Sequence, residues 1–491
     1  MRYAKNLAHG QGLVWNPGGE KVEGFSNPFW VLFMALFHLF PIASSKISLF
    51  IQIFAVLFMI INLFLVRKIA GFISENSLWV SLGAVALTAF YFPLNNWALQ
   101  GTEVSVLTLL MSLVVWHVLR LIKEDGFSVW PFVLMGVGTL LRLDMIVPYL
   151  VVLIFLLSSS PRQRLKNLGW GMLILLAFAG GQVLVRFSYY NEWLPNTYYL
   201  KMTGYPLLLR LTRGLYVFLK FVFRSNWVLF FLPLSIFYFK REKTSDFLFW
   251  IILGQFFYSI WVGGDAWESW GGSNRYISIV MPMYFVLFAC SLRKLGELYL
   301  RASNNEHQRK RRGISIGLSA FIVSSLINFN VLNDSTLLRN WLLIDSPQFV
   351  SKNETRVREA LLLSNLTDEH AVIAVTWAGA LPYFLNRKAV DILGKTDRVV
   401  AREKVRILSW PGKSILSGFL PGHLKWDYSH SLESFQPDVI AQTWLSFDEI
   451  DGFLDKYYSK MTFKKSSMYF KINSPHILWD KLKKRNTTSI H

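Results

Sequence analysis

Three cationic residues carry the chemistry needed to hold a phosphate group. Arg142 stands in "LRLD", Lys201 ends "LPNTYYLK", and Arg275 lies in "GGDAWESWGGSNRY". Guanidinium and ammonium groups bind phosphate through charge-assisted hydrogen bonds. Because the three residues are distant in sequence, they form one anion site only if the fold brings them to the same face.

The loop around Arg275 adds acidic and aromatic side chains. It contains two carboxylates, Asp265 and Glu268, two tryptophans, Trp267 and Trp270, and two Gly-Gly pairs. Glycine lets a backbone approach a ligand closely, and indole faces stack on the apolar faces of sugars. Tryptophan also collects at membrane interfaces, which would explain the indoles but not the carboxylates and glycines. The loop predicts a sugar-binding segment, with an interfacial belt as the alternative for its tryptophans.

Two further positions place charge beside apolar runs. Arg142 and Asp144 interrupt a hydrophobic stretch, and Glu103 stands at the mouth of another. Ionisable residues at membrane depth are costly and mark functional sites. The structural alternatives are an ion pair that holds two short helices together and a carboxylate that complements a helix N-terminus. The sequence leaves both interpretations open.

The elements that must position these residues are predicted membrane helices. Of 491 residues, 53% are hydrophobic and 16% are aromatic, with a mean hydropathy of +0.35, which exceeds the usual apolar share of soluble domains. The stretch 29–40 is too short to span and predicts an interfacial helix. About ten spans are predicted, from apolar runs at 47–66, 78–94, 103–119, 129–157 (which forms two), 168–187, 225–239, 246–262, 276–292 and 314–333.

The basic residues indicate a topology. The net charge is +20, but Lys and Arg fall between apolar runs, which is typical of cytoplasmic loops rather than of nucleic-acid binding. One set of alternate loops carries 17 Lys and Arg and the other carries 7, so the first set is predicted to be cytoplasmic. The polar motifs and the C-terminal tail then lie on the outer face. The single cysteine, Cys290, excludes an intrachain disulfide and a cysteine metal cluster.

The tail differs in character from the apolar region. It is charged and has two short β-like runs, "AVIAVTW" and "DVIAQTW", near helix patterns, which indicates an α/β domain. The predicted fold class is a polytopic α-helical membrane protein with a C-terminal soluble α/β domain. The predicted boundaries are an outer-face loop with its interfacial helix at 1–46, a transmembrane helical domain at 47–333 and an extracytoplasmic domain at 334–491.

Several motifs together resemble one class of membrane glycosyltransferases. Their order and spacing are similar to the GT-C class, and closest to the family of the mycobacterial terminal β-arabinofuranosyltransferase. The resemblance runs over nearly the whole chain. The segments that carry it are "RYAKNLAHGQGLVWNPGGEKVEGFSNPFW" (2–30), "GTE" (101–103), "LRLD" (141–144), "LPNTYYLK" (194–201), "GGDAWESWGGSNRY" (263–276), "TWAGALPYFLNRKAVDILGKTD" (376–397) and "PGHLKWD" (421–427).

This resemblance implies transfer of a sugar from a polyprenyl-phosphate donor to a cell-envelope glycan or lipid acceptor, on the outer face of a bacterial inner membrane. It implies contact with membrane lipid, no nucleic-acid partner and no assigned metal ligands, and it leaves open whether a divalent cation assists. A general base would take the proton of the acceptor hydroxyl, and the carboxylates considered for it are Asp265, Glu23 and Glu20. The residues implied in substrate binding are Arg142, Asp144, Lys201, Arg275, Glu103, Trp267, Trp270, Asn196 and Tyr198.

The chain departs from the family at its start. The family has a first membrane helix and an acidic "DDAF"-like stretch before the "RYA" segment, whereas Met1 adjoins that segment here. The expectation is an N-terminus truncated relative to the family, with a catalytically impaired remnant as one alternative. A transporter or flippase of lipid-linked sugars is the other. Transporters often show internal repeats and polar residues near the bilayer midplane, while here the motifs cluster on one predicted face without a repeat.

Overall fold

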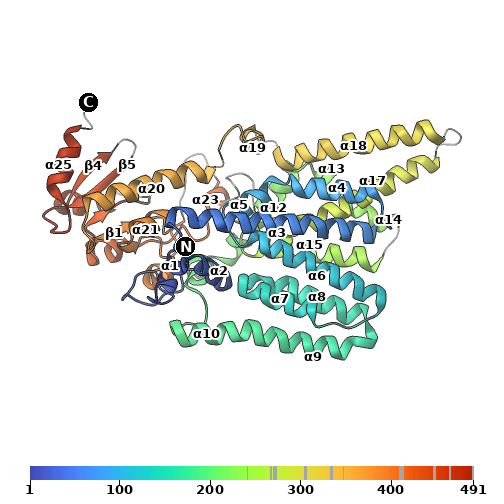
Figure 1. Cartoon of the computed structure of the whole chain (residues 1–491), viewed down its shortest axis with the longest axis horizontal. Coiled ribbons are helices and arrows are strands. Elements are labelled where there is room, and N and C mark those ends of the chain that lie inside the picture. Colours follow the sequence, from blue (N-terminus) through green and yellow to red (C-terminus); the bar gives the residue numbers. More distant parts are fainter. Residues whose placement is uncertain are drawn as a thin grey trace. The chain divides into compact units, whose positions relative to one another are not determined.

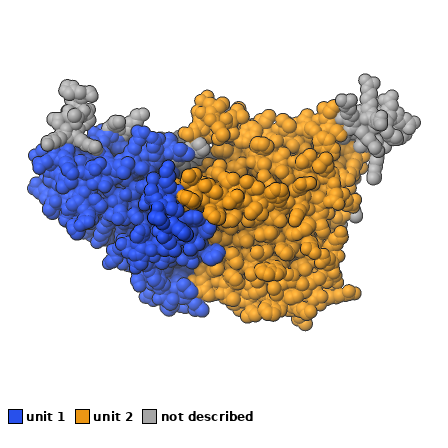
Figure 2. Space-filling model, viewed as in Figure 1, with its two compact units in different colours: residues 1–47, 184–206, 348–491 blue, residues 48–183, 207–347 orange. Residues whose placement is uncertain are grey.

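The computed structural model describes residues 1–239, 242–265, 268, 274–302, 307–331, 335–346, 348–407, 414–445, 449–463 and 466–488. The chain forms two compact units, coloured separately in Figure 2. Unit 1 comprises residues 1–47, 184–206 and 348–491, and unit 2 comprises residues 48–183 and 207–347. The polar N-terminal segment and the 184–206 loop therefore belong to the same unit as the C-terminal tail.

Unit 2 is built from helices (Figure 1). Consecutive helices pack against one another from α6 to α9, and α4 packs along α17. The apolar runs that predict spans coincide with one helix or with consecutive helices to within about two residues, and the end of the last run (332–333) lies outside the described residues. The elements are α3 (Ser44–Ile73), α4 (Leu78–Ala89), α5 (Phe92–Leu99), α6 (Val104–Glu124), α7 (Trp130–Leu141), η1 (Leu143–Met145), α8 (Ile146–Ser159), η2 (Pro161–Gln163), α9 (Arg164–Leu175), η3 (Leu176–Gly180), α12 (Leu207–Arg224), α13 (Trp227–Phe231), η4 (Leu232–Ser235), α14 (Ile236–Phe239), α15 (Lys243–Trp261), α16 (Arg275–Ser278), α17 (Met281–Ala302), α18 (His307–Val331) and α19 (Ser335–Trp341).

The described helices differ in their capacity to cross a membrane. Three are long and apolar enough, namely Ser44–Ile73, Val104–Glu124 and the continuous Pro161–Tyr190. Two bent pairs, Leu78–Ala89 with Phe92–Leu99 and Leu207–Arg224 with Trp227–Tyr238, raise the number to five among the described residues. Length and composition thus support a multi-span protein, while the predicted ten crossings also include helices that do not meet these criteria.

The "LRLD" break separates two short helices, as the sequence predicts. α7 ends at Leu141, Arg142 has an extended backbone with φ −163° and ψ 121°, and the 3-10 turn η1 leads into α8. Gly138 of α7 faces the Met145 side chain, which a Cβ at Gly138 would meet at 3.5 Å. The break places the Arg142 and Asp144 side chains between two apolar helices.

Unit 1 contains a five-stranded sheet with helices around it (Figure 1). The strand order is β2-β1-β3-β5-β4, with β2, β1 and β3 parallel and β5 antiparallel to both β3 and β4. The two runs predicted as strands form β1 and β3, which are apolar and largely buried, as central parallel strands are. The strands are β1 (Val372–Val375), β2 (Lys388–Asp391), β3 (Val439–Ile440), β4 (Tyr458–Phe463) and β5 (Ser466–Lys471).

Hydrogen bonds tie the N-terminal segment to the rest of unit 1. Arg2 donates to the carbonyl oxygens of Pro382 (2.7 Å) and Arg387 (2.6 Å). The stretch predicted as an interfacial helix forms α2, within two residues of its predicted ends. The helices of this unit are α1 (Arg2–Ala8), α2 (Pro28–His38), α10 (Gly181–Tyr190, continuous with α9 through η3), α11 (Asn196–Met202), α20 (Gln348–Leu366), α21 (Ala380–Leu385), α22 (Arg398–Arg402), α23 (Ile415–Gly418), η5 (Ser429–Ser434), α24 (Asp451–Tyr457) and α25 (Trp479–Thr488).

Candidate functional site

The helix break in unit 2 holds a buried guanidinium between two carboxylates. Arg142 donates from Nε and Nη2 to the two carboxylate oxygens of Asp144, at 2.6 and 2.9 Å. Its Nη1 lies 3.6 Å from Glu103 Oε1, and the three side chains are each less than 10% exposed. Glu103 is the residue just before α6, where a carboxylate also complements the helix N-terminus. The three residues predicted around this break therefore form one ion-paired group.

A second guanidinium belongs to the loop between α15 and α16. Arg275 donates from Nε and Nη2 to Asp265 at 2.8 and 3.1 Å, and its backbone N–H donates to the same carboxylate at 3.2 Å. The Asp265 side chain is 1% exposed, while that of Arg275 is 22% exposed. Three hydrogen bonds from Arg275 therefore occupy both carboxylate oxygens of Asp265.

The ring of Tyr276 connects the two groups. The guanidinium carbon of Arg142 lies 5.2 Å from the ring centre, and that of Arg275 lies 5.9 Å from it. Arg275 also faces the ring of Trp97 in α5, at 4.9 Å. Cations within about 6 Å of an aromatic ring are attracted to its face. We refer to Glu103, Arg142, Asp144, Asp265, Arg275 and Tyr276 as the arginine cluster.

Glu268 lies beside this cluster and has a perturbed acidity. Its Oε1 accepts from the Asp265 backbone N–H (2.8 Å) and from Asn274 Nδ2 (2.6 Å). Its Oε2 lies 3.4 Å from Arg213 Nη1 and accepts no hydrogen bond from the described residues. Burial raises the pKa of Glu268 to about 7, although Arg213 opposes the shift. A carboxylate with such a pKa can exchange a proton near neutral pH.

In the arginine cluster, one guanidinium nitrogen of Arg142 and one of Arg275 can donate a further hydrogen bond. Arg142 Nη1 is buried and donates no hydrogen bond to the described residues. Arg275 uses Nε and Nη2 for Asp265, and its Nη1 makes no hydrogen bond within the described part of the chain. An anion with several oxygen acceptors could satisfy these donors, because a buried donor without an acceptor is destabilising.

The carboxylates Glu23 and Glu20 lie in unit 1 and are engaged differently. Glu23 is buried and accepts a hydrogen bond from Arg186 Nε. Burial raises the pKa of Glu23, and the Arg186 guanidinium opposes this shift. Glu20 is exposed and pairs with Arg398, with its Oε1 3.2 Å from Nε. Both carboxylates link segments of unit 1, which is a structural explanation for their presence.

The predicted residues of "LPNTYYLK" are also in unit 1. Asn196 donates from Nδ2 to the carbonyl oxygens of Gly394 (2.9 Å), Lys395 (3.1 Å) and Asp397 (3.0 Å), so it fixes α11 to that loop. The alkyl chain of Lys201 passes over Gly422, where a Cβ would lie 3.1 Å from Lys201 Cγ. Tyr198 is 40% exposed. Unit 2 holds Arg142 and Arg275, so the convergence of Lys201 with them stays a prediction.

Trp267 and Trp270, which are predicted to bind substrate, lie outside the described residues. Within the described ranges, no group of three or more His, Cys, Asp or Glu side chains is arranged to hold a metal ion. Sequence reasoning missed Tyr276 and Trp97 as ring partners of the guanidiniums. Tyr276 stands inside the quoted segment 263–276, next to Arg275, and Trp97 lies six residues before Glu103, so this proximity in the sequence was the available signal.

The chain is similar to known proteins in part of its sequence and in its fold. Residues 28–184 match the family described as dolichyl-phosphate-mannose-protein mannosyltransferase, and residues 347–478 match a domain of unknown function (DUF8728). No curated protein matches the chain.

Two crystal structures of ArnT from Cupriavidus metallidurans are similar. The one bound to undecaprenyl phosphate has 14% identity and a TM-score of 0.52, over 96% of this chain and 93% of that chain. The apo structure has 16% identity and a TM-score of 0.46, over 79% of this chain and 80% of that chain. The likeness to the first is one of fold. Together with the match over residues 28–184, it supports a multi-span membrane glycosyltransferase of the GT-C type.

Proposed function

We propose that this chain transfers a sugar from a polyprenyl-phosphate donor to a hydroxyl of a cell-envelope glycan or lipid, on the outer face of a bacterial inner membrane. The match over residues 28–184 and the fold shared with an undecaprenyl-phosphate-bound ArnT support this class of sugar donor. The observation that carries the proposal is the arginine cluster, in which Arg142 and Arg275 face one ring and keep donors available.

In the proposed reaction the two guanidiniums bind the phosphate of the sugar donor. The acceptor oxygen forms a bond to the anomeric carbon while the bond between that carbon and the phosphate oxygen breaks. The electron pair of the broken bond stays on the polyprenyl phosphate, so negative charge increases there. Fixed cationic hydrogen-bond donors stabilise such charge without reorganisation. Lys201, in unit 1, is proposed as a further phosphate contact on the strength of its motif.

Asp144, Glu103 and Asp265 are proposed to orient these guanidiniums rather than to exchange protons. Each carboxylate already lies against a guanidinium, so it holds that guanidinium in place. Of the carboxylates beside the cluster, Glu268 suits the role of general base better than Asp265, because burial raises its pKa to about 7 and its Oε2, beside Arg213, accepts no hydrogen bond from the described residues. The acceptor hydroxyl would give its proton to that oxygen.

A transfer assay tests the proposal. The purified full chain is given radiolabelled polyprenyl-phosphate pentoses and hexoses together with envelope glycan acceptors, and product is counted. Arg275→Ala should lower transfer by about 100-fold, as the loss of one charge-stabilising donor does. Arg120→Ala is the matched control, because it removes a guanidinium from an exposed pair with Glu124. Transfer by Arg275→Ala at the wild-type rate would contradict the proposal.

A further inference from the structure

One cavity of unit 2 has the chemistry of an anion site. It has a volume of about 520 Å³ and lies between the end of α3, the start of α4 and the second half of α6. Its volume is within the range that small-molecule sites occupy. The residues that line it include Phe64, Arg67, Lys68, Phe72, Leu78 and Trp116.

The charged residues that line this cavity are both cationic. Arg67 and Lys68 line it, and no acidic residue does so among the described residues. Both side chains are exposed, and neither has an ion-pair partner in the described part of the chain. A third cation lies close by, with Lys123 Nζ 5.1 Å from the centre of the Phe72 ring. Any anion in the cavity would therefore meet unneutralised positive charge.

The walls of the same cavity are apolar and aromatic. Phe72 and Trp116 pack edge to face, with ring centres 5.7 Å apart. Phe64 and Leu78, at its rim, are each 62% exposed. Large exposed apolar side chains on helices able to span a membrane are suited to contact acyl chains. The cavity thus combines cations for a headgroup with apolar surface for chains.

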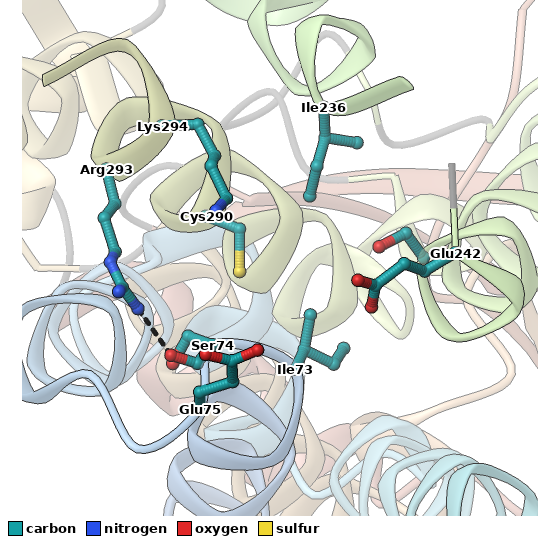
Figure 3. A pocket seen from close by; sticks show the side chains of 9 residues that line it. Ile73, Ser74, Glu75, Ile236, Glu242, Cys290, Arg293 and Lys294 are labelled. Atoms are coloured by element: carbon teal, nitrogen blue, oxygen red, sulfur yellow. Dashed lines mark hydrogen bonds between the residues drawn. The ribbon is translucent and has the colours of Figure 1, made fainter. Parts of the chain in front are cut away.

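A neighbouring cavity is lined by both cationic and anionic residues. It measures about 80 Å³ and is lined by Arg293 and Lys294 but also by Glu75 and Glu242 (Figure 3). Arg293 donates to the Ser74 carbonyl oxygen, and both cations pair with Glu297. Equal numbers of charges of each sign leave little attraction for an anion, so this cavity serves as an internal comparison.

The larger cavity is remote from the arginine cluster. Trp116 lies 13 residues along α6 from Glu103, which corresponds to about 20 Å at the helical rise. Arg67 and Lys68 lie at the C-terminal end of α3, in a segment that the distribution of Lys and Arg predicts to be cytoplasmic. Basic pockets between membrane helices on that side bind anionic lipid headgroups. We propose that this cavity binds the phosphate headgroup of an anionic glycerophospholipid, such as phosphatidylglycerol, with its acyl chains against Phe64 and Leu78.

Titration with short-chain lipids tests this site. The detergent-purified full chain is titrated with dihexanoyl phosphatidylglycerol, and binding is followed by the shift in unfolding temperature and by native mass spectrometry. Arg67→Gln with Lys68→Gln should weaken apparent affinity by about 30-fold, because each cation near an anionic lipid contributes about a fivefold gain. Lys294→Gln, in the smaller cavity, should leave affinity unchanged.

Two other ligands separate the possible sources of the effect. Dihexanoyl phosphatidylcholine lacks net charge and should stabilise the protein less, and inorganic phosphate at the same concentration should not reproduce the shift. An equal shift with inorganic phosphate would overturn the proposal in favour of a free-anion site. Equal phosphatidylglycerol affinity in wild type and the double variant would overturn it as well. Both results are independent of sugar transfer, so the assignment of the arginine cluster would be unaffected.

Discussion

The guanidinium carbon of Arg142 lies 5.2 Å from the centre of the Tyr276 ring, although the two residues belong to separate motifs. Arg142 comes from the break between α7 and α8, and Tyr276 comes from α16. Arg275, beside Tyr276 in sequence, faces the same ring. This shared ring makes one arginine cluster from a helix break and a loop.

Removing the ring of Tyr276 should reduce transfer. Tyr276→Ala is expected to lower kcat/KM by about tenfold, because partly buried cation–π contacts contribute about 1–2 kcal/mol. Tyr276→Phe keeps the ring and should retain most of the activity. Tyr238→Ala, at a position 89% exposed, serves as the control. If Tyr276→Phe were as impaired as Tyr276→Ala, the hydroxyl rather than the ring would be the important group.

The pH dependence of transfer should report on Glu268. A general base must be deprotonated, and burial raises the pKa of Glu268 from 4.5 to about 7. The rate should therefore be half-maximal near pH 7 and fall about tenfold per pH unit below it. Glu268→Gln should be slow and nearly independent of pH. A wild-type rate that stays constant from pH 5.5 to 8 would rule out this role.

The same pKa shift predicts a change in stability. Protonated Glu268 is favoured in the folded state, so its contribution to stability is fully present below pH 4.5 and is lost as the pH rises through about 7. Glu268→Gln removes the charge, so its unfolding temperature relative to wild type should rise between pH 5 and pH 8. Scanning calorimetry of both proteins at several pH values measures this difference. A constant difference would mean that Glu268 keeps an ordinary pKa.

Glu23 and Arg186 should behave as a structural ion pair. Each side chain is less than 5% exposed, so removing one partner leaves a buried, uncompensated charge. Glu23→Ala and Arg186→Ala are each expected to lower the free energy of unfolding by about 3–5 kcal/mol, and the double variant by less than the sum. Chemical denaturation of the four proteins measures the coupling. A purely additive double variant would argue against direct pairing, and a folded Glu23→Gln protein without transfer would support the prediction that Glu23 is the base.

Asn196 should act on the folding of unit 1. Its Nδ2 donates to three carbonyl oxygens, and hydrogen bonds contribute about 1 kcal/mol each. Asn196→Ala is expected to destabilise the protein by about 2 kcal/mol while KM for the sugar donor changes little. Thermal unfolding and steady-state kinetics on the same preparation separate the two effects. A raised KM without loss of stability would support the substrate-binding role that the sequence motif predicts.

The sequence predicts the elements well and the side-chain partners less well. Apolar runs locate the helices of unit 2, and two β-like runs locate β1 and β3, because hydrophobic patterning follows local burial. The interruption at Arg142 and Asp144 correctly predicts two short helices. That Glu103 joins this pair depends on how α6 packs beside α7, which local patterning does not encode.

Other features of the molecule arise only from long-range contacts. Residues 1–47 and 184–206 join the tail in unit 1 through bonds such as those of Arg2 and Asn196. The family resemblance implies a substrate role for Asn196, and the structure adds that its amide holds a loop. The raised pKa of Glu268 results from burial, which a sequence does not specify. The residue types that can do chemistry are therefore identifiable from the sequence, while their roles depend on how the side chains pack in the fold.

Arg142 and Arg275 are proposed to bind the phosphate of a polyprenyl-phosphate sugar donor. The most direct test of this proposal is an experimental structure of the full chain with bound undecaprenyl phosphate. We expect phosphate oxygens within about 3 Å of Arg142 Nη1 and of the Arg275 guanidinium, with both ion pairs to Asp144 and Asp265 retained. A phosphate held elsewhere, with the arginine cluster unchanged and unoccupied, would contradict the proposal.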